Sequence, residues 1–87
     1  MGPHLKLRKI NALYDYILYE DPETSLTRNQ IRHLITNHLI PGVVMNGKVY
    51  LASSFGLRIY FTYPNASIDE LNDIYTKAIL SETKIGA

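Results

Sequence analysis

Apolar residues recur along this chain at helical spacing in some stretches and in short runs in others, and this pattern predicts the order of its elements. From Leu5 to Glu20 they lie three or four positions apart, which is typical of the buried face of a helix. The residues of this stripe are Ile10, Leu13, Tyr14, Ile17 and Leu18. The helix should end at Asp21, because a residue before proline is disfavoured in the α region.

A second helix is predicted to begin at Ser25 or Thr27, since either side chain can cap exposed N–H groups. It should run to Leu39, before a stop at Pro41-Gly42. Its buried stripe is Ile31, Leu34, Ile35 and Leu39. The opposite face is rich in Arg and amide side chains, which is typical of a partner-binding face but also of any solvated helix.

Two short apolar runs, 43–45 and 48–52, flank Asn46-Gly47. Asn-Gly is the strongest two-residue signal for a β-hairpin, because its turn needs positive φ. After a second turn at residues 53–56, the run LRIYFTY (Leu57 to Tyr63) is β-branched and aromatic. This run predicts a third strand, antiparallel to the second.

The last helix is predicted to begin after Ser67, with Glu70 at capping-box spacing. Its apolar stripe is Ile68, Leu71, Ile74, Tyr75, Ala78 and Ile79. The sequence therefore predicts an α+β fold with the order α-α-β-β-β-α and a three-stranded antiparallel meander. Residues 5–83 should form a single domain, with a frayed end at 84–87. Residues 1–4 resemble a cloning remnant, and we leave them out of the fold prediction.

Composition narrows the classes of protein that the chain can belong to. A chain of 87 residues with 46% hydrophobic residues is a small globular domain. It contains no cysteine, which excludes a disulfide framework and a thiolate metal site. No apolar run reaches the roughly 20 residues that span a bilayer, so we expect no membrane partner and an intracellular location, cytoplasmic or nuclear.

The net charge is +1, but the charges are unevenly distributed. Up to Arg58 the chain carries seven Lys and Arg against four acids, and after it two against four. This asymmetry permits a basic face, although dedicated DNA-binding domains are usually more basic.

No residue pattern indicates catalysis or a metal site. His33 and His38 are five apart and cannot share a metal on one helix face. Neither a nucleophile elbow nor a phosphate-binding glycine loop is present. We therefore expect a protein that is not an enzyme, with no cofactor, no metal and no small-molecule substrate.

The run IRHLITNHLIPGVVMNGKVYL, from Ile31 to Leu51, resembles the end of a winged-helix domain. In that superfamily a helix leads through a turn into a hairpin, the wing. PCI-type scaffold domains and many DNA-binding proteins share this arrangement, and VMNGKVY also resembles the wing of small phage or transposon excisionases. A standard winged helix has three helices before the wing, whereas two are predicted here.

This resemblance implies binding of double-stranded DNA through the helix Thr27–Leu39 and the hairpin tip. Arg can pair with guanine, and Asn or Gln with adenine, while Lys48 would contact a phosphate. The expected DNA-binding residues are Arg28, Asn29, Gln30, Arg32, His33 and Lys48.

The alternative is a protein-interaction or assembly module: a scaffold component, or a homodimer formed through the sheet edge or the last helix. Tyrosine and arginine are enriched at interfaces. The residues expected in such an interface are Tyr60, Phe61, Tyr63 and Tyr75. A double-stranded RNA-binding domain is disfavoured, because the last helix begins with acidic residues.

Overall fold

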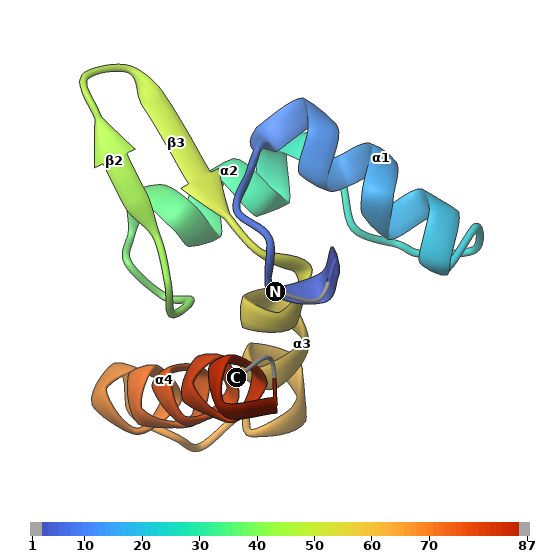
Figure 1. The fold of residues 1–87 in the computed structure, drawn as a ribbon. Helices are drawn as coiled ribbons and strands as arrows, with labels where there is room; N and C mark the ends of the chain where they lie inside the picture. The colour runs from blue at the N-terminus through green and yellow to red at the C-terminus, as the bar shows by residue number, and fades with distance from the viewer. Residues whose placement is uncertain (1–2, 86–87) are drawn as a thin grey trace.

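The computed structural model describes residues 3–85, which form an α+β fold of four α-helices and a three-stranded antiparallel sheet (Figure 1). The elements in chain order are η1 (Pro3–Leu5, a 3₁₀ turn), β1 (Arg8–Lys9), α1 (Ile10–Glu20), α2 (Arg28–Thr36), β2 (Val44–Asn46), β3 (Val49–Ala52), α3 (Ser54–Thr62) and α4 (Ile68–Ile85).

The sheet has the strand order β1-β3-β2, so its third strand comes from the N-terminal segment. Arg8 pairs with Ala52 and Lys9 with Leu51, while Val44 pairs with Leu51 from the other side. The predicted three-stranded antiparallel sheet is confirmed, but the predicted meander is wrong. The predicted helix from Leu5 also begins later, because residues 8 and 9 are extended and pair with β3.

The predicted hairpin is confirmed, with its turn one residue later than expected. Asn46 pairs with Val49, which leaves Gly47 and Lys48 as the two turn residues. Gly47 has a φ of +62°, as predicted, whereas Asn46 is not among the residues with positive φ. Glycine at the first turn position is the arrangement of a type II′ turn.

Both ends of α2 are fixed by local hydrogen bonds. Thr27 is the N-cap: its Oγ1 accepts from the N–H of Gln30, and Gln30 Oε1 accepts from the N–H of Thr27. This capping box was not predicted, although Thr27 was a predicted cap. The helix ends three residues before the predicted Leu39, because His38 adopts the left-handed conformation (φ 54°). Leu39 is consequently 38% exposed, and Ile40 is buried instead.

The predicted third strand, Leu57–Tyr63, is wrong, because residues 57–62 belong to helix α3 and Tyr63 is its C-cap residue. Ser53 caps this helix by accepting from the N–H of Gly56 at 3.0 Å. The helix lies between two apolar clusters and contributes Leu57 to one and Ile59 to the other. A helix that is buried on two sides lacks a simple polar face, so its periodicity is hidden in the sequence.

The two apolar clusters divide the core between the two ends of the molecule. The first joins α1, α2 and β3, and its buried members include Leu13, Ile31 and Ile35. The second joins Leu5 and Ile59 to Leu71 and Tyr75 of α4. Helix α4 lies at the opposite end from the hairpin turn (Figure 1). Ser67 caps it as predicted, its Oγ accepting from the N–H of Glu70.

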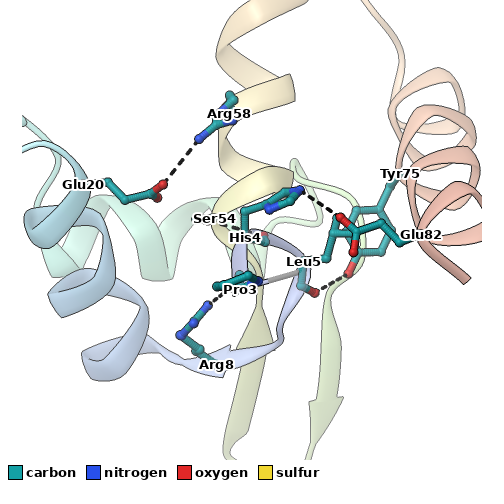
Figure 2. Close-up of polar contacts among 9 residues, drawn as sticks. All are labelled: Pro3, His4, Leu5, Arg8, Glu20, Ser54, Arg58, Tyr75 and Glu82. Atoms are coloured by element: carbon teal, nitrogen blue, oxygen red, sulfur yellow. Dashed lines mark hydrogen bonds and ion pairs between the residues drawn. The ribbon is translucent and has the colours of Figure 1, made fainter. Parts of the chain in front are cut away.

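The N-terminal segment packs between α3 and α4, which the sequence did not indicate (Figure 2). The carbonyl of His4 accepts from Ser54 Oγ at 3.3 Å, and His4 Nε2 lies 3.6 Å from Glu82 Oε1. Leu5 is completely buried. Pro3 and His4 therefore belong to the fold, while Met1 and Gly2 lie outside the described residues. At the other end α4 continues to Ile85, while residues 86–87, the rest of the end that was predicted to fray, lie outside the described part.

Candidate nucleic-acid interface

A surface groove of about 730 Å³ lies where the start of α1, the outer side of α2 and the hairpin meet. We call it the basic groove. The described residues that line it are Lys9, Ile10, Asn11, Ala12, Arg32, Lys48, Val49 and Tyr50. Three of these are cations and none is acidic, which makes the groove a candidate site for an anionic partner.

Each cation of the basic groove is held by a different element. Lys9 ends β1, and its pairing with Leu51 fixes its backbone at the sheet edge. Arg32 projects from the exposed side of α2, one residue after the buried Ile31. Lys48 occupies the second position of the hairpin turn. Because the three residues are distant in sequence, their meeting at one groove is a product of the fold.

The first turn of α1 adds positive potential to the basic groove. Lys9 is the N-cap residue, and its side chain makes no capping hydrogen bond. The three residues that begin the helix, 10–12, line the groove. Uncapped N–H groups and the helix dipole give a helix start a partial positive charge, which favours an anion beside it.

Protein contacts engage three of the six side chains that were predicted to bind DNA: those of Arg28, Gln30 and His33, whose Nδ1 lies 3.1 Å from Asn37 Nδ2. The guanidinium of Arg28 stacks on Tyr14, 4.4 Å from the ring centroid. The side-chain oxygen of Gln30 is held by the capping box of α2. Arg32 and Lys48 come together in the basic groove, and Arg28 and Gln30 do not line it.

The other two predicted residues, Asn29 and His33, line a second groove, between α2 and α3. This groove, of about 480 Å³, is lined by Ser25, Leu26, Asn29, Gln30, His33, Leu34, Tyr60 and Phe61. We call it the aromatic groove. The rings of Tyr60 and Phe61 meet edge to face, with centroids 5.1 Å apart.

The residues of the alternative protein interface separate into surface and core. Phe61 is 54% exposed and Tyr63 48%, while Tyr60 is half-buried. Tyr75, in contrast, is only 8% exposed. Its ring packs on Gly42, and its hydroxyl lies 3.5 Å from the Leu5 carbonyl. Placing Tyr75 in a surface interface is therefore corrected: it is a core residue.

The sequence prediction missed Lys9, because it placed this residue inside a helix that began at Leu5. Arg8 and Lys9 alone are too short a run to indicate a strand. The position of Lys9 could have indicated its role, because it directly precedes Ile10, the first residue of the apolar stripe. A helix is expected to start at such a position.

Two further kinds of feature, a metal site and a membrane-spanning helix, are absent from the part of the chain that the structure describes. Within residues 3–85, no three His, Asp or Glu side chains gather closely enough to hold a metal ion. No helix in the same described part is long and apolar enough to cross a membrane.

Comparison with protein-family models, with curated proteins and with solved structures gives no match for this chain.

Proposed function

We propose that this protein is a non-enzymatic DNA-binding module with a winged-helix arrangement. Helix α2 is the recognition helix, and the β2–β3 hairpin is the wing. The observation that carries this proposal is the basic groove, in which three separate elements bring Lys9, Arg32 and Lys48 together without an acidic neighbour among the described lining residues.

The partner is a duplex whose backbone lies along the basic groove. Phosphate contacts from Lys and Arg supply most of the non-specific affinity for DNA, and helix N-termini are frequent phosphate partners. A helix fits into the major groove of B-DNA, which is about 12 Å wide. With the backbone held in the groove, the exposed side of α2 faces the bases and Lys48 reaches the adjacent phosphates from the wing.

The charges elsewhere on the molecule favour the same orientation. Asp69 and Glu70 lie in the first turn of α4, at the end opposite to the hairpin turn (Figure 1). Repulsion between these carboxylates and phosphate disfavours docking through α4, so the field of the protein directs the hairpin end toward DNA.

A salt-series titration against random duplex DNA tests the proposal. Each phosphate contact contributes a slope of about −0.9 to log K against log salt, so three contacts give about −3. The double variant R32A/K48A should flatten this slope by about 2 units. The variant R58A/K77A removes the same two residue types and is the matched control, because Arg58 and Lys77 pair with Glu20 and Asp73 instead. It should retain the parent slope. A flat parent slope, or equal effects of the two variants, would refute DNA binding through this groove.

The second candidate function is protein assembly through the aromatic groove and the adjoining end of α3, where Tyr63 is the C-cap residue. It is favoured by the exposure of Phe61 and Tyr63, since large exposed aromatic side chains are typical anchors of interfaces. Sedimentation of the parent and of the variant F61A/Y63A tests it. A parent dimer that the variant converts to monomer, together with a flat salt slope, would make assembly the better conclusion.

A further inference from the structure

The side chain of Asn37 folds back over the last turn of α2 and contacts one residue twice. Its Nδ2 lies 2.8 Å from the carbonyl oxygen of His33 and 3.1 Å from Nδ1 of the same imidazole. The backbone of Asn37 is held as well, because its N–H donates to the His33 carbonyl at 3.1 Å. The C-cap residue is thus fixed against the ring by three contacts.

These contacts determine where the imidazole carries its proton. A backbone carbonyl only accepts hydrogen bonds, so the atom of Asn37 at 2.8 Å must be the amide NH₂ group. The second hydrogen of this group then points to Nδ1 of His33, which must accept it. In a neutral imidazole one nitrogen accepts and the other donates, so the proton of His33 lies on Nε2.

Other polar side chains on the exposed face of α2 are engaged within the protein, although that of Asn29 makes no hydrogen bond with the described residues. Arg28 stacks on Tyr14, Gln30 closes the capping box, and Thr36 Oγ1 donates to the Arg32 carbonyl at 2.9 Å. Arg32 lies in the basic groove. The exposed Nε2–H of His33 is therefore a hydrogen-bond donor of fixed identity on the outer face of the helix.

We propose that His33 reads a guanine in the major groove by donating from Nε2 to guanine N7, and that Asn37 is the positioning residue that keeps Nδ1 as the acceptor. Guanine presents two neighbouring acceptors, N7 and O6, in the major groove. Adenine also presents N7, but beside its N6 amine, which is a donor, so a donor placed near both positions favours guanine over adenine. This inference rests on the proposed function, because it assigns base selection to the same face of α2.

The first measurement needs no DNA. Long-range nitrogen–proton NMR spectra of the free protein at about pH 8, where an ordinary imidazole is neutral, distinguish the two tautomers. His33 should show the Nε2–H form in the parent and a mixture of both forms in the variant Asn37→Ala. A parent ring with Nδ1–H would overturn the proposal.

The second measurement locates the base. Duplexes selected from a randomised library by the parent are re-synthesised with each guanine in turn replaced by 7-deazaguanine, which lacks N7. One replacement should weaken parent binding about tenfold, in the range expected for a base contact. The variant His33→Ala should bind the unmodified site about tenfold more weakly and should not respond to that replacement. Asn37→Ala should show an intermediate response, with unchanged affinity for random DNA.

The variant His38→Asn is the matched control, since it removes the neighbouring imidazole at a left-handed position that asparagine tolerates. It should respond to 7-deazaguanine as the parent does. If the parent shows the expected salt dependence of DNA binding, but 7-deazaguanine weakens binding equally in the parent and in His33→Ala, the guanine contact is overturned and the proposed function stands. A parent without duplex binding would overturn the proposed function as well.

Discussion

The hairpin end and the α4 end of this molecule differ in what their side chains do. At the hairpin end Val44, Met45 and Val49 are exposed, and the basic groove gathers cations that no ion pair among the described residues occupies. At the α4 end the apolar residues Leu71 and Tyr75 are buried against Leu5 and Ile59. The acids Asp69 and Glu70 lie in the first turn of α4, where the helix dipole favours them. Under the proposed function, the α4 end serves stability and the hairpin end binds DNA.

Deleting residues 66–87 is the strongest test of this division. The deletion would expose Leu5, Ile59 and the side of Gly42 that contacts Tyr75. A domain of this size cannot remain folded without a large part of its core. We expect a fragment without a cooperative thermal transition, with poorly dispersed amide NMR signals. A fragment that melts cooperatively would show that the first cluster is self-sufficient and that α4 is an appendage.

Alanine at Gly42 should destabilise the protein far more than alanine at Gly47. Both glycines have positive φ, but a Cβ at Gly42 would lie 2.5 Å from the Tyr75 ring, whereas nothing lies within 4 Å at Gly47. Backbone strain and overpacking together should cost roughly 3 kcal/mol at Gly42, and strain alone about 1 kcal/mol at Gly47. Urea unfolding of both variants measures the difference. Equal losses would contradict the close contact between α4 and the α2–β2 connection.

Removing the cap of α2 should have an intermediate effect. Thr27→Ala loses the hydrogen bond from the Gln30 N–H, so we expect a loss of about 1 kcal/mol in the free energy of unfolding. The change should also free the side chain of Gln30, because the two caps support each other. Chemical denaturation of Thr27→Ala and Gln30→Ala, alone and together, measures their coupling. Strictly additive losses would show that the capping box does not act as a unit.

Single charge removals should change stability least. Lys48→Ala at the hairpin turn and Lys77→Ala in the exposed pair with Asp73 should each alter the free energy of unfolding by less than about 0.5 kcal/mol. Their DNA affinities should nevertheless differ, with only Lys48→Ala weakened. A large stability loss at Lys48 would mean that the hairpin tip serves the fold.

The elements that were predicted correctly are indicated by sequence patterns that span only a few neighbouring residues. Asn46-Gly47 indicated the hairpin, Ser67 with Glu70 indicated the start of α4, and the spacing of Ile31, Leu34 and Ile35 indicated α2. Each of these depends on turn chemistry, capping or one buried face, so tertiary contacts were not needed to recognise them.

The elements that were missed depend on contacts that are distant in sequence. Leu57 and Ile59 are two apart, which indicates a strand, but they belong to opposite sides of a helix placed between two clusters. Burial on both sides outweighed the β propensity of this run. Likewise, β1 forms by pairing with β3, in which Lys9 lies opposite Leu51. The sequence does not reveal this pairing, so neither the strand nor the third cation of the basic groove was predicted.

The central claim is that DNA binds at the hairpin end, and amide chemical-shift mapping tests it most directly. Duplex DNA is titrated into nitrogen-15-labelled protein, and the shifts of each backbone amide are followed. The largest changes should fall on residues 9–12, around Arg32 and around Lys48, while the amides of α4 should not shift. Changes confined to residues 60–63 and α4, or no changes at any DNA concentration, would contradict it.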